Sequence, residues 1–197
     1  MNKEKLDFKD EIKKQIIESA SLKKEIIEKH ADTINDIAIA IINAYKNNKK
    51  VIWFGNGGSA ADAQHLSCEL VSKFLIERKA LFSIALTTNT SILTAVSNDY
   101  SFEKVFARQV EAYAEKGDII LGITTSGTSP NVLEALDTGK KIGAITVAFT
   151  GQDTSKIKNL ADYLVDIPSK KTPRIQEAHI MIGHIICEIV EKKLFAD

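Results

Sequence analysis

Cysteine and long apolar runs are scarce in this sequence of 197 residues. Its two cysteines, Cys68 and Cys187, form no Cys-x-x-Cys pair, which argues against a disulfide framework or a thiolate zinc site. Both are expected to pack as small apolar side chains. No apolar run reaches the roughly 18 residues of a membrane-spanning helix. The charged opening, MNKEKLDFKDEIKKQ, lacks the apolar stretch of a secretory signal. We therefore expect a cytoplasmic protein with no membrane partner.

The sequence also lacks an excess of charge of either sign. Lysine and arginine total 26 residues, and so do aspartate and glutamate. This balance argues against a general binder of polyanions, so no nucleic-acid partner is expected. The length suits one α/β domain, and we predict a single domain over residues 1–197.

Five short apolar segments after residue 50 predict a parallel sheet. They read VIWFG, LFSIAL, DIILGITT, AITVAFTG and YLVDIP, and the first four each precede turn residues and a helical pattern. This alternation is typical of βαβ units, and strands that are apolar throughout suit a sheet covered on both faces. We predict a doubly wound, five-stranded parallel sheet over residues 49–197, a three-layer α/β fold of flavodoxin-like or Rossmann-like kind.

Residues 1–48 show helical periodicity ahead of that sheet. Isoleucines recur at helical spacing, and a break at 31–33 would divide the segment into two helices. The first half is so polar that its apolar stripe needs a partner surface, such as another subunit. We therefore predict an N-terminal helical pair that serves oligomerisation.

Two strand-to-helix turns look suited to a phosphate. The first, GNGGSA, follows VIWF; its glycines let backbone N–H groups approach an anion, and Asn56 and Ser59 can donate from their side chains. The second, TTSGTSPN at residues 124–131, offers five hydroxyls in six residues. Either turn could be only a helix cap, but two on one sheet favour a ligand site.

A nucleotide does not fit these turns. The sequence has no P-loop motif, Gly-x-x-x-x-Gly-Lys-Ser/Thr. Gly55, Gly57 and Ala60 match a dinucleotide fingerprint, but the second predicted strand runs into Thr87 instead of ending in the acid that would hold a ribose. We expect no nucleotide cofactor and a small sugar phosphate as ligand.

Polar side chains on two predicted helices form a second candidate site. His65 and Glu69 are four residues apart and share a helix face, and the last helix carries Gln176 and His184 on an apolar pattern. These residues could also have purely structural roles: His65 and Glu69 as an exposed helix pair, and His184 as a hydrogen-bonded histidine of the core. Two imidazoles, a carboxylate and a carboxamide could instead hold zinc. Gln176 and His184 are about 12 Å apart along a straight helix, so a shared ion needs leaning side chains or two subunits.

These motifs together resemble one family. The segments GNGGSAADAQH, SNDYSFEKVFARQVE, GDIILGITTSGTSPNV and TPRIQEAHIMIGHIICEIVE are similar to the phosphoheptose isomerase family of SIS (sugar isomerase) domain proteins, over nearly the whole chain. The resemblance implies a homotetramer, with the active site at a subunit interface, that converts sedoheptulose 7-phosphate to D-glycero-D-manno-heptose 7-phosphate. This is the first step of nucleotide-activated heptose synthesis for lipopolysaccharide or another surface glycan.

The resemblance also assigns roles to residues. It implies that Glu69 is the catalytic base and His184 the acid, and that a zinc ion has His65, Glu69, Gln176 and His184 as ligands. The two sets overlap at Glu69 and His184, and the sequence does not choose between the roles. The substrate-binding residues that it implies are Asn56, Gly57, Gly58, Ser59, Glu69, Asn98, Asp99, Thr124, Thr125, Ser126, Ser129 and Gln176.

Two other functions remain open at this level. The DnaA initiator-associating protein shares the fold and much of the pattern but is a non-catalytic binding protein. Retention of Glu69, Gln176 and His184 together favours an enzyme. An arabinose 5-phosphate isomerase is the third reading, although such enzymes usually carry extra regulatory domains for which this chain has no room.

Overall fold

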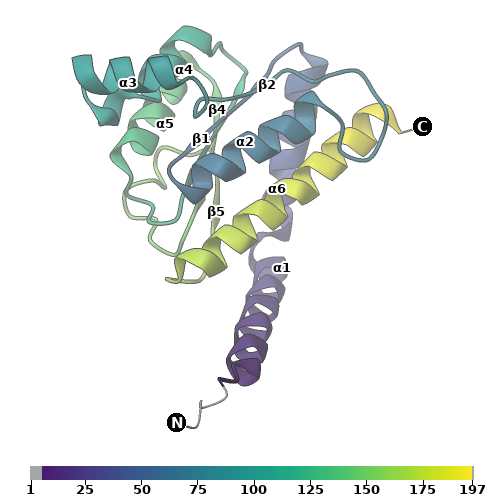
Figure 1. Cartoon of the computed structure of the whole chain (residues 1–197). Coiled ribbons are helices and arrows are strands. Elements are labelled where there is room, and N and C mark those ends of the chain that lie inside the picture. The colour runs from purple at the N-terminus through teal and green to yellow at the C-terminus, as the bar shows by residue number, and fades with distance from the viewer. Residues whose placement is uncertain (1–5, 197) are drawn as a thin grey trace.

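The computed structural model describes residues 6–196 and places five parallel strands at the centre of the chain (Figure 1). The strands are β1 (Val51–Gly55), β2 (Ser83–Ala85), β3 (Ile119–Thr124), β4 (Ile145–Thr150) and β5 (Tyr163–Asp166). They lie in the order β2-β1-β3-β4-β5, and every neighbouring pair is parallel. The predicted doubly wound sheet is confirmed. In this order the winding direction reverses between β1 and β3, where open α/β sheets bind their ligands.

Helices cover both faces of the sheet. They are α1 (Lys9–Lys46), α2 (Gly58–Val71), α3 (Thr90–Asp99), α4 (Ala107–Tyr113), α5 (Pro130–Ile142) and α6 (Thr172–Phe195), with a 3₁₀ turn η1 (Phe102–Lys104). Apolar side chains of α1, α2 and α6 pack on one face, against Trp53, Leu121 and Phe149. Those of α4 and α5 pack on the other, against Phe54 and Ile120. Because both faces are covered, β1 and β3 are buried at every residue.

The N-terminal segment is one helix, so the predicted pair with a break at 31–33 was wrong. A buried stripe of Leu22, Ile26, His30 and Ile34 passes through those residues without interruption. The polar member of the stripe, His30, places Nε2 at 2.7 Å from the backbone oxygen of Asp166 and 3.3 Å from its carboxylate, at the end of β5. This partner satisfies the buried imidazole, so nothing in the fold forces the helix to end there.

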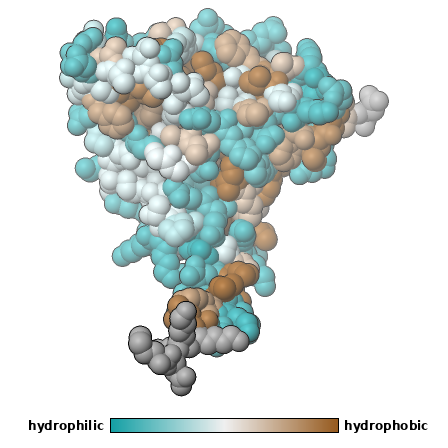
Figure 2. Space-filling model, in the orientation of Figure 1, coloured by the Kyte–Doolittle hydropathy of each residue, from teal (hydrophilic) through white to brown (hydrophobic). Residues whose placement is uncertain are grey.

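The first turns of α1 extend beyond the sheet and its covering helices (Figure 1). Ile12, Ile16 and Ile17 on these turns are 55%, 63% and 64% exposed. Figure 2 shows hydrophobic side chains gathered on this projecting end. The predicted apolar stripe thus exists, and among residues 6–196 it is left exposed at these three isoleucines.

The two cysteines differ in their surroundings. Cys187 is buried in α6, as expected, and burial raises the pKa of its thiol to about 12. Cys68 is exposed, so the expectation that it packs as a small apolar side chain was wrong. It lines a surface hollow between α2 and the edge strand β2. Among residues 6–196, no helix is long and apolar enough to cross a membrane.

Candidate active site

The glycine loop (residues 55–59) and the hydroxyl loop (residues 124–131) leave neighbouring strands at the switch point. Gly55 at the end of β1 pairs in register with Ile123 of β3. A double amide hydrogen bond ties the loops together: Asn56 and Asn131 each donate from Nδ2 to the other's Oδ1 at 2.9 Å. Asn131 is 2% exposed. Sequence reasoning missed it, because an asparagine after Pro130 gives no sign of a partner so far away in the chain.

Three of the four predicted phosphate-binding hydroxyls converge in the hydroxyl loop. Thr124 Oγ1 lies 2.9 Å from Ser129 Oγ and 3.3 Å from Ser126 Oγ. The half-buried Thr125 takes no part in these contacts within residues 6–196. Gly127 turns the loop at a φ of 68°, where a Cβ would also collide with the backbone oxygen of Asp153. The loop ends at the N-terminus of α5, whose dipole favours a negative charge.

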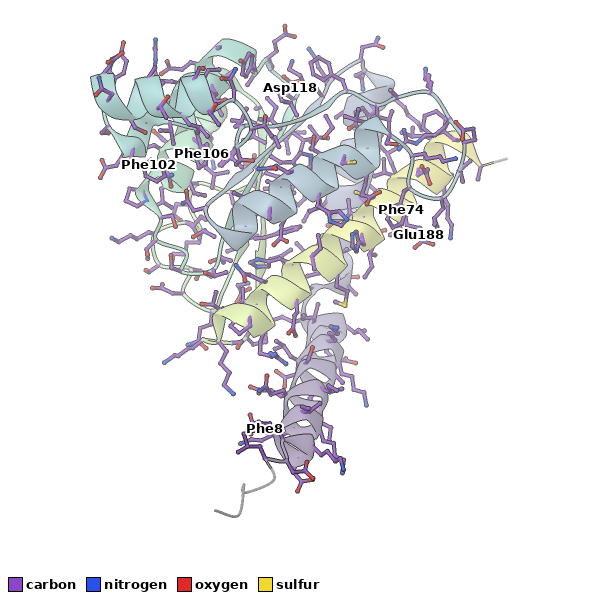
Figure 3. The ribbon with its side chains drawn as sticks, viewed as in Figure 1. Phe8, Phe74, Phe102, Phe106, Asp118 and Glu188 are labelled. Carbon is purple, nitrogen blue, oxygen red and sulfur yellow. The ribbon has the colours of Figure 1, made fainter. Side chains whose placement is uncertain are left out.

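The glycine loop presents backbone next to a carboxamide. Gly57 and Gly58 are exposed, whereas Ser59 is 3% exposed. Gln176 of α6 lies so close to Gly58 that a Cβ there would collide with its carboxamide. Beside the loop is a small cavity of about 150 Å³, whose wall includes Phe102 and Phe106, labelled in Figure 3.

His65, Glu69 and His184 come together where α2 packs on α6. His65 Nε2 lies 2.9 Å from Glu69 Oε1 and 3.1 Å from His184 Nε2. The candidate donor atoms of the three side chains all lie within 4.8 Å of one another. The site is open to solvent, since the side chain of His65 is 50% exposed and that of Glu69 is 21% exposed. His184 is half-buried, less than its apolar neighbours in the sequence indicated.

The proton count of this cluster fits a bound cation. Nε2 of His65 carries at most one hydrogen, yet it faces both a carboxylate oxygen and a second imidazole nitrogen. One N–H cannot be donated well in both directions. A divalent metal between the three side chains would accept all three lone pairs, and two nitrogens with one oxygen are a donor set that zinc takes.

Other predicted site residues stand apart from this cluster in the single chain. Gln176 faces Gly58, seven residues before His65 on α2, so its role as a metal ligand stays a prediction. Asn98 and Asp99 end α3, where both are exposed and bond each other (Nδ2 to Oδ1, 2.9 Å). Within residues 6–196, no hydrogen bond joins them to the other predicted site residues.

Asp62 is a further polar residue near the site that sequence reasoning passed over. It lies on α2 three residues before His65, and its Oδ2 is buried without a hydrogen-bond partner among the described residues. Burial raises the pKa of this carboxyl, and the nearby His65 opposes the shift. The only sequence signal that could have singled out Asp62 was its position in the segment AADAQH.

Comparison with known proteins identifies the family of the chain. A sequence model of the SIS domain matches residues 16–151. The phosphoheptose isomerase of Clostridium acetobutylicum is 50% identical over 192 residues, which span 96% of this chain and 98% of the relative. The chain belongs to the phosphoheptose isomerase family of SIS domain proteins. The relative from Aquifex aeolicus is 51% identical over 183 residues, 93% of this chain and 96% of its own.

Solved structures of this family have the same architecture. The phosphoheptose isomerase of Neisseria gonorrhoeae superposes with a TM-score of 0.89 at 36% identity, over 94% of this chain and 100% of that one. The phosphoheptose isomerase of Francisella tularensis gives 0.90 at 34% identity, over 95% and 100%. The resemblance seen in the sequence motifs is therefore confirmed for the family and for the fold.

Proposed function

We propose that this chain is an aldose–ketose isomerase that converts sedoheptulose 7-phosphate to D-glycero-D-manno-heptose 7-phosphate. The observation that carries the proposal is the cluster of His65, Glu69 and His184, in a chain about half identical to phosphoheptose isomerases. The product would enter nucleotide-activated heptose synthesis for lipopolysaccharide or another surface glycan. We place the reaction in the cytoplasm, where phosphorylated sugars are made.

The side chains suit proton transfer between two neighbouring carbons. Glu69 Oε1 contacts His65, and Oε2 remains for the proton on the carbon beside the carbonyl. The electron pair of that C–H bond forms the double bond of an enediol, while His184 gives a proton to the carbonyl oxygen. Glu69 then gives its proton to the former carbonyl carbon, while the hydroxyl on the first carbon gives its proton to His184. That hydroxyl becomes the new carbonyl, and both residues regain their starting protonation. The hydroxyls of Thr124, Ser126 and Ser129 hold the phosphate at the far end of the substrate.

Zinc is the proposed resident metal, with His65, Glu69 and His184 as ligands and Gln176 as a fourth. When bound, it would supply Lewis-acid polarisation of the substrate carbonyl in place of proton donation by His184, because the lone pair of His184 Nε2 would then be on the metal. The chain's own groups define where the carbonyl must lie, because the two imidazoles and the carboxylate converge on one point. Removal of metal with a chelator, followed by return of zinc alone, is the direct check of this assignment.

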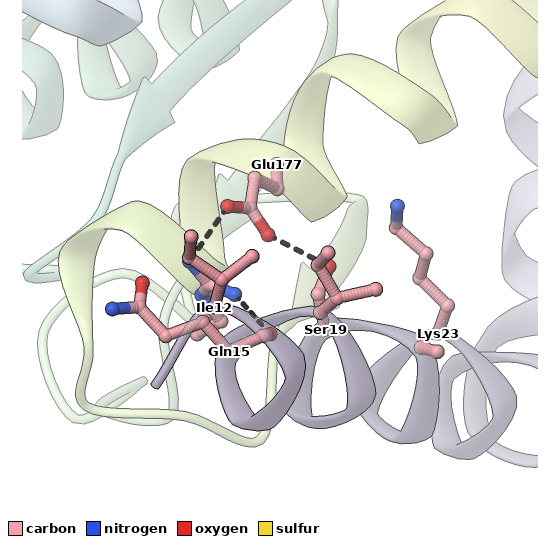
Figure 4. Close-up of a pocket in the computed structure, with 8 residues that line it drawn as sticks. Ile12, Gln15, Ser19, Lys23 and Glu177 are labelled. Carbon is pink, nitrogen blue, oxygen red and sulfur yellow. Dashed lines mark hydrogen bonds and ion pairs between the residues drawn. The ribbon is translucent and has the colours of Figure 1, made fainter. Parts of the chain in front are cut away.

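A homotetramer with shared active sites is supported by two surfaces. The cavity beside the glycine loop, about 150 Å³, is small next to the roughly 300–1,000 Å³ of typical ligand pockets, so a neighbouring subunit is proposed to complete it. A larger pocket of about 460 Å³ lies between α1 and the start of α6, and Ile12 and Ile16 contribute to it (Figure 4). Arg174 and Glu177 of α6 fix this part of α1, since Arg174 donates to the Gln15 oxygen at 2.6 Å and Glu177 accepts from Ser19 at 2.7 Å.

Replacement of an exposed isoleucine on α1 is expected to break the assembly. Ile16→Glu places a charge in the apolar patch that another subunit would bury, which should shift the tetramer to smaller species in light scattering after gel filtration. Asn159→Glu adds the same charge at an exposed position before β5, whose neighbour Leu160 packs on the face of the sheet opposite α1, and should leave the tetramer intact. Equal masses for both variants would contradict an interface at this patch.

A non-catalytic role like that of the DnaA initiator-associating protein is not favoured. The chain keeps an acid, a base and a convergent donor set, which a scaffold does not need. The relatives at about 50% identity are named phosphoheptose isomerases.

Turnover by the purified full chain tests the proposal. Zinc-loaded protein is incubated with sedoheptulose 7-phosphate, and the aldose product is followed by NMR, with arabinose 5-phosphate as the competing substrate. We expect the heptose phosphate to form and the pentose phosphate to remain unchanged. Absence of heptose turnover in folded, zinc-loaded protein would overturn the isomerase assignment, and a pull-down with the initiator protein would then test the binding role.

A further inference from the structure

A buried ion pair lies just beyond the candidate active site, between the ends of α2 and α6. Arg78 Nε donates to Glu191 Oε1 at 2.9 Å, and both side chains are 1% exposed. Arg78 belongs to the segment 72–82 that joins α2 to β2, and Glu191 lies on α6 seven residues after His184. A pair so fully removed from water is tolerated only when its other donors and acceptors are also satisfied.

The carboxylate of Glu191 anchors the joining segment to α6. It accepts backbone N–H groups from three successive residues, Phe74 at 2.8 Å, Leu75 at 2.6 Å and Ile76 at 2.9 Å. Burial by itself would raise the pKa of Glu191, but these three amides and Arg78 together lower it. The segment 72–82 is thus held to α6 by hydrogen bonds to the charged carboxylate of Glu191.

The guanidinium of Arg78 reaches the backbone of Glu69 itself. Its Nη2 donates to the Glu69 oxygen at 2.8 Å, and its Nη1 donates to the oxygens of Leu70 at 2.9 Å and Ser72 at 3.1 Å. The last carbonyls of a helix have no partner within it, so Arg78 acts as the C-terminal cap of α2. One side chain therefore connects the backbone of the proposed base to the helix that carries the proposed acid.

The same segment also contacts His184. The ring of Phe74 lies 5.7 Å from the His184 ring, centroid to centroid, with an angle of 30° between the planes. Figure 3 labels Phe74 beside α6. Since Glu191 binds the Phe74 amide, the position of this ring against the imidazole depends on the buried pair.

We propose that Arg78 and Glu191 are positioning residues of the isomerase, which set the separation and orientation of Glu69 and His184. The inference rests on the proposed function, because it takes these two residues as base and acid. Neither Arg78 nor Glu191 touches the converging donor atoms. They act through the end of α2, through α6 and through Phe74.

Two conservative variants test this role. Arg78→Lys keeps the charge but loses the planar fork that serves Glu191 and the three carbonyls, and Glu191→Gln keeps the shape but leaves the Arg78 charge unpaired. A misplacement of about 1 Å at a reacting group can cost about 100-fold, so we expect kcat to fall by about 10- to 100-fold with little change in KM. The imidazole NMR signals of His184 should shift in both variants.

Asp118 provides the matched control. Its carboxylate is also fully buried, pairs with Lys50 at 2.7 Å, and accepts the backbone N–H groups of Lys50 at 3.0 Å and Glu115 at 2.7 Å. It precedes β3, so it lies at the opposite end of that strand from the hydroxyl loop. Asp118→Asn should lower stability as Glu191→Gln does, but leave kcat and the His184 signals unchanged.

The outcomes are distinct. Unchanged kcat and unchanged His184 signals in folded Arg78→Lys and Glu191→Gln protein would overturn the positioning role. If neither variant folds, Phe74→Leu decides by the same two readouts, because it leaves the buried pair intact and alters only the ring against His184. A wild-type chain without turnover would contradict the proposed function instead, and the His184 signals would still test the positioning role.

Discussion

Replacement of Glu69 by glutamine is expected to lower kcat for the heptose phosphate by about 10²- to 10⁴-fold, the usual contribution of general acid–base catalysis. Glutamine keeps the shape of the side chain and an oxygen for the contact with His65, but it cannot take a proton. Initial rates with zinc-saturated protein measure the effect. Activity of Glu69→Gln within twofold of the wild type would remove Glu69 from the mechanism.

Glu188→Gln is the control for this substitution. Glu188 lies on α6, the helix that carries His184 (Figure 3), and pairs with Lys192 on the surface at 2.5 Å. Loss of that exposed pair should change kcat by less than twofold. Zinc content separates the two roles of Glu69: protein that retains zinc but loses turnover identifies a base, whereas loss of both identifies a ligand whose removal empties the site.

The sheet and its ligand edge were predictable because their signals are local. Each strand lies in a mainly apolar run without polar alternation, and each of the first four runs ends in a turn and a helical pattern. The carboxyl ends of neighbouring parallel strands share one edge, so the glycine loop and the hydroxyl loop had to meet if β1 and β3 were adjacent. The contact between His65 and His184 could not be predicted in the same way, because it depends on how α2 packs on α6.

The missed features depend on partners that are distant in sequence. The false break in α1 came from reading 31–33 as an interruption, whereas Asp166 of β5 satisfies His30 inside the stripe. Asn131 matters because Asn56 faces it from another loop. Arg78 and Glu191 are 113 residues apart, and each alone reads as a surface charge. Local pattern describes elements well, but it does not say which polar side chains pair across them.

The second large expected effect concerns the pH dependence of the free energy of unfolding, and it comes from a buried histidine. His179 of α6 is fully buried, and its Nε2 donates to the Thr150 oxygen at the end of β4 at 3.1 Å. Its Nδ1 is buried with no partner among the described residues, and the ring packs against Phe149 at 5.7 Å between centroids. Protonation of Nδ1 would therefore bury an unpaired charge. Burial lowers the pKa of His179 to about 4, although the bond to Thr150 acts to raise it.

The direction of the effect follows from where the proton binds. Between about pH 6.5 and pH 4 the unfolded chain protonates His179 and the folded chain does not, so acid favours unfolding. The stability that neutral His179 contributes is complete above pH 6.5 and is lost as the pH falls, by about 3 kcal/mol over this range. His179→Gln keeps an N–H for the Thr150 oxygen but has no proton to gain. Urea unfolding at fixed protein concentration should show that the wild type loses more stability than His179→Gln from pH 7 to pH 5. All other titrating groups are shared, so equal losses would mean that the imidazole finds a partner for its second nitrogen in solution.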